Sequence, residues 1–342
     1  MEIDEIKQFL DSSLNIAYPA YVCAICDKNG TTYKLKGGYT SYEDDREPIT
    51  YDTLFDLASL TKIVGPTMLS CRYIDKGLLN LEDTIDKFFV TKYYSKANIK
   101  NLMTHTAGFT PEIRLSNYLK NPNDALNYIL NQRPIYEIGS QVNYSCMGYI
   151  VLGKILEKIG NNSLDILCKQ EVFNPLNMEK ITYRPNSNNK FAATEVPPNK
   201  NKALLGIVHD ENARFLNGIS ANAGLFSPIE DLIKLVQMLL NNGQEFLSND
   251  IFYLLTHNLV KNNLAEKRAL GFKIVDKTKK EFFGDQVSNL AYGHTGFTGT
   301  SIVIDSQKNK GVILLTNRVH PTRDNKQLLN LRSEFHNLVF KK

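Results

Sequence analysis

Tryptophan and long apolar runs are both missing from this 342-residue chain. A membrane-spanning helix needs about 18 or more consecutive apolar residues, and none occurs, so we expect no membrane span. An excess of one charge is missing as well, because 40 Lys and Arg stand against 36 Asp and Glu, leaving a net charge of +4. A charge this small and scattered excludes the basic footprint of a nucleic-acid-binding protein. The remaining composition is that of an ordinary globular chain, whose length predicts about two folding units.

Signal-peptide features are also missing from residues 1–15. This segment is acidic and lacks the basic start and apolar stretch that an export signal carries. Four of its apolar residues instead share one face of a predicted amphipathic helix, namely Ile3, Ile6, Phe9 and Leu10. We therefore expect a cytoplasmic protein, or an exported one if a leader has been removed.

Cysteine is scarce, with five residues in the chain. An odd number this small does not make a disulfide scaffold and suits a reducing compartment. Cys23 and Cys26 have the C-x-x-C spacing of a redox or zinc motif, but they lie in the strand-like run YVCAIC. Residues three apart in a strand point to opposite faces, so we interpret both as buried thiols. We expect no cofactor and no metal.

Strand-like segments lie at both ends of the chain and helical segments between them. Two strands are predicted at 18–27 and 31–39, joined by an Asn-Gly turn, which is typical of a hairpin. Three more are predicted near the end of the chain, at Ala269–Val275, at Tyr292–Gly293 with Thr300–Asp305, and at Gly311–Asn317. Helices are predicted at 60–76 with a kink or break at Pro66, and at 98–103, 122–132, 146–159, 163–171, 228–242 and Asn325–Phe340.

This order of elements predicts an α+β fold, an antiparallel β-sheet flanked by helices with an inserted, mainly helical domain. We expect residues 1–78 and 225–342 to form the sheet domain and residues 79–224 the helical domain. The stretch Arg184–Lys202 is rich in Asn and Pro, which indicates an irregular surface loop.

The tetrad Ser59-Leu60-Thr61-Lys62 opens a predicted helix and carries the strongest chemical signal. In the first turn the Ser59 hydroxyl lies off the helix N-terminus, where free N–H groups favour developing negative charge. Lys62 follows one turn later on the same face, where its amine lowers the cost of an alkoxide or accepts its proton. Taken alone, the tetrad is better explained by a helix cap at Ser59 and a solvated charge at Lys62. A second S-x-x-K tetrad, at Ser187, lies in a polar loop, and we interpret it as coincidence.

Two further motifs complete a constellation. Tyr144-Ser145-Cys146 immediately precedes the apolar helix Met147–Ile159, again at a helix start. His294-Thr295-Gly296 lies in the run GHTGFTGTS between strand-like segments, where glycines allow close approach of a ligand. The three motifs have the order and context of a serine acyl-transfer site built from separated pieces.

On these motifs the sequence resembles the serine β-lactamase and penicillin-binding protein superfamily, on its class C β-lactamase, D-alanyl-D-alanine peptidase and esterase side. The resemblance covers nearly the whole chain. It extends through DLASLTK at 56–62, LMTHTAG at 102–108, VHDENA at 208–213, NAGLFS at 222–227 and LTNRVHPTR at 315–323. It implies a β-lactamase/transpeptidase-like fold.

The resemblance also implies roles for individual residues. Ser59 matches the nucleophile, Lys62 its activating partner and Tyr144 the tyrosine that exchanges protons with the serine and the leaving group. Tyr144 is a base only if a cation such as Lys62 lowers its pKa. The backbone N–H groups of Ser59 and Phe297 would form the oxyanion hole. The residues that the resemblance implies for contact with the substrate or the oxyanion are Cys146, His294, Thr295, Gly296 and Phe297.

Two residues depart from the family pattern. Cys146 stands where an asparagine is usual, and a thiol is a poor hydrogen-bond donor. His294 replaces lysine, which makes the cation at this point conditional on pH. Both departures favour an esterase, peptidase or amidase over an efficient β-lactamase.

The remaining polar residues give weaker signals. We interpret His105 and His320 as structural hydrogen-bonding residues. His209 is followed by Asp210 and Glu211, and these three are residue types that bind metal ions. Because three successive residues share no face, the wall of a cleft is favoured there. Arg318 and Arg323 either meet a substrate carboxylate or pair with acidic neighbours.

We therefore expect a metal-free serine hydrolase that acts through an acyl-enzyme on an ester, a D-amino-acid peptide or a cell-wall-derived amide. The expected partner is a small-molecule or peptide substrate, with β-lactams as inhibitors. Three alternatives stay open. They are a penicillin-binding or sensor protein acylated with little turnover, a weak class C-like β-lactamase, and a thiol enzyme that uses Cys146.

Overall fold

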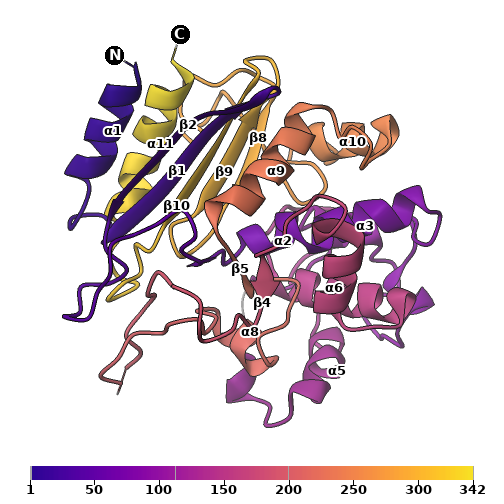
Figure 1. Ribbon diagram of the computed structural model, residues 1–342. Coiled ribbons are helices and arrows are strands. Elements are labelled where there is room, and N and C mark those ends of the chain that lie inside the picture. The colour runs from indigo at the N-terminus through magenta and orange to yellow at the C-terminus, as the bar shows by residue number, and fades with distance from the viewer. Residues whose placement is uncertain (1, 112, 199, 342) are drawn as a thin grey trace.

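A seven-stranded antiparallel sheet joins the two ends of the chain (Figure 1). The computed structural model describes residues 2–111, 113–198 and 200–341. The strand order is β2-β1-β10-β9-β8-β7-β6, so the first strands of the chain pair with the last. This confirms the predicted antiparallel sheet. The strands are β1 (Ala20–Asp27), β2 (Gly30–Gly38), β6 (Lys267–Arg268), β7 (Lys273–Ile274), β8 (Ala291–Thr295), β9 (Ser301–Asp305) and β10 (Lys310–Thr316).

Helices cover both faces of this sheet. The first and last helices, α1 (Glu2–Ser12) and α11 (Gln327–Phe340), lie together on one face, and α9 (Ile229–Leu240) lies on the other (Figure 1). Cys23 packs in the apolar layer beneath α1 and α11, whereas Cys26 packs in the layer on the α9 side. Both are free thiols on opposite faces of β1, as the spacing predicts.

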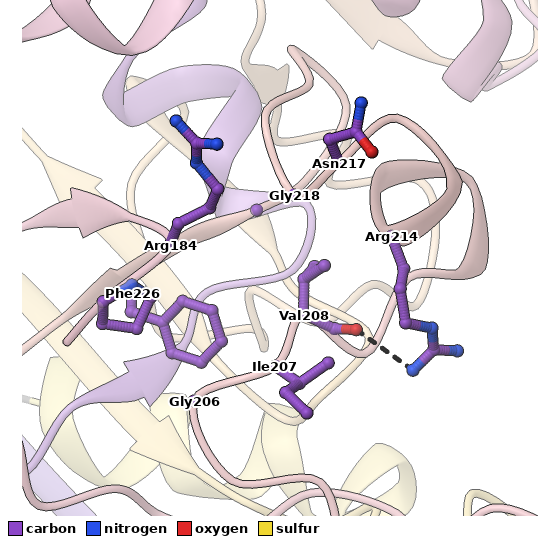
Figure 2. A pocket seen from close by; sticks show the side chains of 10 residues that line it. Arg184, Gly206, Ile207, Val208, Arg214, Asn217, Gly218 and Phe226 are labelled. Atoms are coloured by element: carbon purple, nitrogen blue, oxygen red, sulfur yellow. Dashed lines mark hydrogen bonds between the residues drawn. The ribbon is translucent and has the colours of Figure 1, made fainter. Parts of the chain in front are cut away.

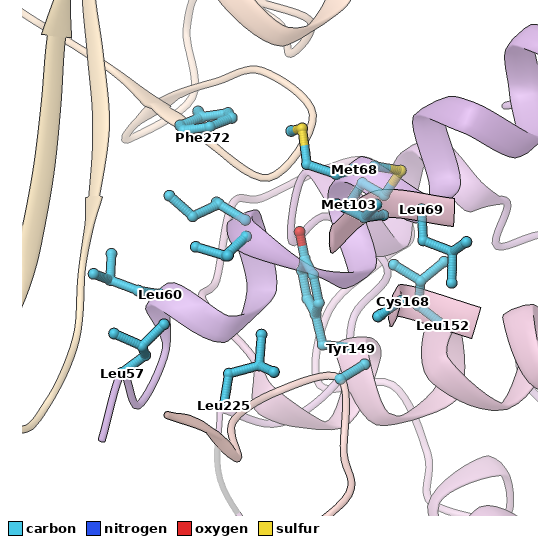
Figure 3. Close-up of a cluster of buried hydrophobic side chains, with 14 of the residues drawn as sticks. Leu57, Leu60, Met68, Leu69, Met103, Tyr149, Leu152, Cys168, Leu225 and Phe272 are labelled. Atoms are coloured by element: carbon cyan, nitrogen blue, oxygen red, sulfur yellow. The ribbon is translucent and has the colours of Figure 1, made fainter. Parts of the chain in front are cut away.

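The helical part of the molecule lies beside the sheet (Figure 1). Its helix predicted at 60–76 is broken at Gly65, because Pro66 starts a new helix. Buried side chains around Tyr149 fill the space between these helices (Figure 3). The helices are α2 (Leu60–Val64), α3 (Pro66–Asp75), α4 (Ile99–Met103), α5 (Ala125–Leu130), α6 (Cys146–Gly160), α7 (Leu164–Cys168), α8 (Glu211–Phe215) and α10 (Asn249–Thr256), with short helical turns at Ile85–Lys87, Leu115–Asn117, Pro122–Asp124 and Lys169–Phe173.

A second, three-stranded sheet includes the short strand that leads into the segment carrying Ser59. Its order is β3-β5-β4, with β3 at Phe55–Asp56, β5 at Leu225–Ser227 and β4 at Thr182–Tyr183. One apolar core runs from the large sheet into the helices, through residues of both predicted domains. The division at residues 78 and 225 stays a prediction.

The strand predicted at Ala269–Val275 is correct only at β7, which covers Lys273–Ile274. Residues 269–272 instead form a turn between β6 and β7, with Arg268 paired to Lys273. Gly271 adopts a left-handed φ of 74°, which closes the turn. The apolar residues on either side, Leu270 and Phe272, are buried because the turn inserts into the core. Burial of the turn therefore gives it the apolar pattern of a strand. In addition, α10 had no counterpart in the sequence prediction.

The described residues contain no helix that combines the length and the apolar character needed to cross a bilayer.

Asn317 joins the end of β10 to three separate segments. Its side chain is 1% exposed. Its Oδ1 accepts from the Ala20 N–H at 3.1 Å, and its Nδ2 donates to the carbonyls of Thr40 at 3.1 Å and Ala193 at 3.0 Å. Asn317→Ala leaves three buried backbone groups without partners. We expect it to lower the free energy of unfolding by about 2–4 kcal/mol in urea denaturation.

The control for this prediction is Asn189→Ala, which removes an exposed asparagine side chain. We expect a change below about 0.5 kcal/mol for the control. Equal stabilities of the two variants would show that Asn317 does not hold these segments together.

Candidate active site

Ser59 is placed by the small sheet and by a strained residue before it. The Leu57 N–H donates to the carbonyl of Leu225 at 2.9 Å, which continues the pairing of β3 with β5. Ala58 has a left-handed φ of 44°, and its N–H donates to the Asp56 carboxylate at 2.8 Å. Strain of this kind in a residue other than glycine persists only where neighbouring contacts enforce it. It sets Ser59 at the first turn of α2, half-buried at the edge of a cleft.

Lys62 is the most buried charge of the cleft, with no exposed surface. Its Nζ donates to Ser59 Oγ at 3.0 Å, to the carbonyl of Asn222 at 2.8 Å and to Cys146 Sγ at 3.6 Å. An ammonium has three hydrogens to donate, and each has an acceptor here. The predicted meeting of Ser59 and Lys62 on one helix face is thus present in the structure.

Tyr144 lies directly beside this amine, with its ring centre 4.9 Å from Lys62 Nζ. Its hydroxyl is buried and has no hydrogen-bond partner in the described residues. Burial raises the pKa of Tyr144, and the nearby Lys62 charge only partly offsets this. The condition for Tyr144 to act as a base, a pKa lowered by a cation, is therefore not met in the free protein, because desolvation outweighs the attraction of Lys62.

The protonation of Lys62 follows from the same contacts. Burial opposes its charge, but Cys146 and Tyr144 beside it outweigh burial and raise the pKa of the amine. The free protein accordingly holds an ammonium at Lys62 and a neutral phenol at Tyr144 near pH 7.

His294 is neutral as well near pH 7, and the sequence predicted only that its charge depends on pH. It is buried in β8, and burial, together with Arg268 and Lys62, lowers its pKa well below the ordinary value. Its Nδ1 lies 2.8 Å from the carbonyl of Thr295, which places the hydrogen on Nδ1. Its buried Nε2 therefore presents a lone pair and has no partner in the described residues.

His105 fixes the segment that carries Tyr144. Its Nδ1 accepts from the Ser145 N–H at 3.1 Å, and its carbonyl accepts from the Asn143 N–H at 2.9 Å. Its ring lies 4.5 Å from the Tyr144 ring, centre to centre. This structural role is the one predicted.

The turn between β8 and β9 packs on the residues just before Ser59. Thr298 Oγ1 donates to the carbonyl of Asp56 at 2.7 Å. Gly296 lies so close to the carbonyl of Leu57 that a Cβ there would stand 2.5 Å from its oxygen. The N–H groups of Ser59 and Phe297 donate to nothing within the part of the chain that the structure describes. Two donors are thus left free in the two predicted oxyanion segments.

Two cavities open on either side of Phe297 and share Ser59, Tyr144 and Phe297. We call the larger one, of about 400 Å³, the arginine cavity, and the smaller one, of about 240 Å³, the thiol cavity. The arginine cavity is also lined by Glu266, Arg268, Lys273, Phe282, His294, Thr295, Gly296, Arg318, Leu329 and Arg332. The thiol cavity is also lined by Ala58, Pro111, Cys146, His209, Asp210, Glu211, Ala223 and Arg323.

All eight predicted site residues thus lie around these two cavities or beside Lys62, although they come from three separated motifs. The loop at His209 forms a wall of the thiol cavity, as predicted. His209 Nε2 lies 3.0 Å from Glu195. Within the described ranges no three acidic, histidine or cysteine side chains gather as a metal-binding group.

The two interpretations left open for Arg318 and Arg323 have different outcomes. Arg323 pairs with Glu195 and Glu211, at 2.5 and 2.7 Å. Arg318 has no carboxylate partner in the described residues. Its Nη1 donates to the carbonyls of Asn325 at 2.6 Å and Arg323 at 3.3 Å. His320 is structural, accepting from the Tyr42 N–H at 3.0 Å.

Sequence reasoning missed four charged residues of the arginine cavity, which are Glu266, Arg268, Lys273 and Arg332. The first three lie around the β6–β7 turn, where a continuous strand was expected. Arg332 could have been found, because it falls on the apolar face of α11, four residues after Leu328 and three before Phe335. A charge on the buried face of a helix is unusual.

A separate hollow of about 250 Å³ lies elsewhere, between Arg184, Arg214 and Phe226 (Figure 2). Arg214 donates to the carbonyl of Val208 at 3.2 Å there. None of the predicted site residues lines this hollow.

Comparison with known proteins agrees with this geometry. The family described as Beta-lactamase matches residues 6–335, and the chain belongs to that family. It is a serine hydrolase of the β-lactamase-related kind. The N-acetylmuramyl-L-alanine amidase of Bacillus subtilis (strain 168) is 29% identical, over 93% of this chain and 81% of the relative. A putative D-alanyl-D-alanine carboxypeptidase of Escherichia coli (strain K12) is 26% identical, over 93% and 82%.

Solved structures share the fold. The octameric penicillin-binding protein homologue from Pyrococcus abyssi matches with a TM-score of 0.77 at 20% identity, covering 97% of this chain and 77% of that one. EstCE1, a hydrolase with promiscuous acyltransferase activity, matches with a TM-score of 0.78 at 18% identity, covering 99% and 98%. These matches confirm the predicted β-lactamase/transpeptidase-like fold.

Neutral buried histidines make the stability of this protein sensitive to acid. Burial lowers the pKa of His105 and His294 well below 6.5 and that of His336 to about 3. The unfolded chain binds these protons near pH 6.5 while the folded chain does not, so stability falls as pH falls. Each histidine contributes a loss of about 1.4 kcal/mol between pH 7.5 and 5.5. Urea denaturation at the two pH values measures the sum.

Asp56 acts in the opposite direction and reduces this loss. Burial raises its pKa to about 6, so the folded chain gains a proton as pH falls through 6 and is stabilised by about 1 kcal/mol. We therefore expect a net loss of at least about 3 kcal/mol, because burial also lowers the pKa of His209 and of His320, which adds to the loss. His257→Gln replaces an exposed histidine and should keep that loss. Equal stability of the wild type at both pH values would contradict neutral buried histidines.

Proposed function

We propose that the chain cleaves an ester, a D-amino-acid peptide or a cell-wall-derived amide through an acyl-enzyme on Ser59. The observation that carries this proposal is the 3.0 Å hydrogen bond from buried Lys62 to Ser59 Oγ. Because the amine donates to Oγ, the oxygen's own hydrogen points elsewhere and its lone pair is held in place. An ammonium at this distance also stabilises negative charge that develops on the oxygen.

A proton must leave the pair of Lys62 and Tyr144 before either group accepts the Ser59 proton. When it has left, Oγ attacks the substrate carbonyl carbon and its proton passes to the pair. The N–H groups of Ser59 and Phe297 are positioned to receive the resulting oxyanion. Collapse breaks the bond to the leaving group, which takes the proton from the pair. Water then attacks the acyl-enzyme by the same route and releases the acid.

The substrate class is supported by the relatives and by Cys146. The two relatives above are named as an N-acetylmuramyl-L-alanine amidase and a putative D-alanyl-D-alanine carboxypeptidase, and these names favour an amide or peptide substrate. Cys146 offers a weak donor where the family has an asparagine amide, which supports poor hydrolysis of β-lactams. A cell-wall-derived amide is therefore our first choice, and an ester is the convenient probe.

Ser59→Ala should lower the turnover of p-nitrophenyl acetate at least about 1,000-fold, because the acyl-enzyme has no oxygen to form on. It should also abolish labelling by a fluorophosphonate. Ser187→Ala, in the other S-x-x-K tetrad, is the matched control and should keep both properties. Turnover that survives in Ser59→Ala but is lost on treatment with iodoacetamide would instead assign the reaction to Cys146.

The wild type and Ser59→Ala also discriminate among substrates. A muropeptide amide, a D-alanyl-D-alanine peptide and nitrocefin are each offered to the wild type and to Ser59→Ala. We expect Ser59-dependent cleavage of the amide or the peptide, with slow acylation by nitrocefin. Stoichiometric labelling without turnover of any substrate would favour a sensor, and rapid nitrocefin hydrolysis would favour a β-lactamase.

The raised pKa values of Lys62 and Tyr144 predict an alkaline rate profile. Below the pKa of the pair, the fraction that has lost its proton grows about tenfold for each pH unit. We therefore expect kcat/KM for p-nitrophenyl acetate to rise through pH 6 to 9, after subtraction of the hydrolysis seen with Ser59→Ala at each pH. A plateau that begins below pH 7 would show that the base is already unprotonated in the free protein.

A further inference from the structure

His209 lies in the wall of the thiol cavity, which Ser59 also lines. Its backbone N–H donates to the Asp56 carboxylate at 2.6 Å, and the same carboxylate accepts from the N–H of Ala58, the residue just before Ser59. Its ring stacks on Phe297, with 5.6 Å between the ring centres and 22° between the planes. These contacts tie the imidazole to both of the predicted oxyanion segments.

Glu195 determines which ring nitrogen of His209 carries the hydrogen. The Nε2 of His209 lies 3.0 Å from Glu195 Oε2. Burial opposes the charge of Glu195, but hydrogen bonds from Arg323 outweigh burial and lower the pKa of this carboxyl, so it stays ionised. An ionised carboxylate only accepts hydrogen bonds. The hydrogen is therefore on Nε2, and Nδ1 keeps a lone pair.

The lone pair on Nδ1 of His209 is available to a molecule in the cavity. Nδ1 has no hydrogen-bond partner within the described residues, and it is not sealed from solvent. Because the ring lines the thiol cavity, Nδ1 opens there. Burial, together with Arg323, lowers the pKa of His209 and outweighs the nearby carboxylates of Glu195 and Glu211. The ring is thus neutral near pH 7 and ready to accept a proton.

Hydrolysis of the acyl-enzyme requires a base, because water is a weak nucleophile until it loses a proton. The pair of Lys62 and Tyr144 holds its protons near pH 7 and must lose one before it accepts another. Nδ1 of His209 has no proton to lose. The Glu195 carboxylate on the far side of the ring also stabilises the imidazolium that forms when Nδ1 accepts a proton.

We propose that His209, oriented by Glu195, is the base that takes a proton from the water that hydrolyses the acyl-enzyme. This inference rests on the proposed function of Ser59 and concerns its last step alone. The water follows the route of Ser59 through the oxyanion, and only the group that receives its proton differs.

The proton passes from water to Nδ1 of His209 while the water oxygen bonds to the carbonyl carbon. Collapse breaks the ester bond to Ser59 Oγ, the proton returns from Nδ1 to that oxygen, and the acid is released. Acylation still depends on the pair of Lys62 and Tyr144. The two halves of turnover thus use different bases, which makes them separable by kinetics.

The hydrolysis of p-nitrophenyl acetate tests this separation. Release of p-nitrophenol accompanies acylation, so kcat/KM reports acylation alone, whereas kcat also depends on hydrolysis of the acyl-enzyme. His209→Gln should lower kcat at least about 30-fold and leave kcat/KM within about threefold, because general-base catalysis typically contributes about 100-fold or more. The acetyl group should accumulate on Ser59. A burst of p-nitrophenol equal to the protein concentration and the intact mass of the protein both measure this accumulation.

Two further variants and a second nucleophile serve as controls. Glu195→Gln keeps an acceptor for Nε2 but removes the negative charge, and it should lower kcat about tenfold with kcat/KM unchanged. His257→Gln replaces an exposed histidine and should keep both constants. Hydroxylamine attacks an ester without first losing a proton to a base. It should therefore release the acetyl group from His209→Gln as fast as from the wild type.

A parallel fall of kcat and kcat/KM in His209→Gln would overturn the proposal, because His209 would then act in acylation or in the placement of Ser59. An unchanged kcat would also overturn it, since the pair of Lys62 and Tyr144 would serve both steps. Accumulated acyl-enzyme that hydroxylamine does not cleave would assign His209 a structural role instead. Wild-type turnover that survives in Ser59→Ala is a different result, and it would overturn the proposed function itself.

Discussion

The buried ammonium of Lys62 is the interaction on which the site depends. It donates to the Ser59 hydroxyl, to the Asn222 carbonyl before β5 and to the Cys146 sulfur at the start of α6. Each of these comes from a different stretch of the chain, and each supplies one acceptor. A charge without exposed surface must have its donors satisfied. The contacts that keep Lys62 in place are therefore the same contacts that bring Ser59 and Cys146 together.

The sheet supplies the other half of this arrangement. Because β1 pairs with β10, the two ends of the chain belong to one sheet, and the β8–β9 turn of that sheet packs on the segment just before Ser59. Thr298 and Gly296 then contact the backbone at Asp56 and Leu57. Gly296 permits the close approach because it has no Cβ. The two predicted oxyanion segments are thus held by backbone contacts, and the Phe297 side chain lines both cavities.

Much of this was predictable from the sequence. Helix-start placement put Ser59 and Lys62 on one face, and β-strand geometry placed Cys23 and Cys26 on opposite faces. The antiparallel sheet followed from strands at both ends. The β6–β7 turn did not follow, because a buried turn at Gly271 carries the apolar residues of a strand. The protonation states of the site residues could not be predicted from the sequence either. His294 and Tyr144 are shifted by burial, and the burial of a side chain depends on tertiary packing that a motif does not contain.

Neutral His294 and the charged residues Arg318 and Arg332 line the same cavity. The family pattern places a fixed lysine at the position of His294, whereas here the ring is uncharged and buried. The positive charge of the arginine cavity lies instead on Arg318 and Arg332, farther along the chain. The carboxylate of Glu266, in the same cavity, pairs with Arg268 and Lys273 and therefore does not neutralise Arg318 or Arg332. The whole chain has a net charge of only +4. The buried guanidinium groups of Arg318 and Arg332, which have no carboxylate partner in the described residues, therefore concentrate positive charge locally in this cavity, at a cost in stability.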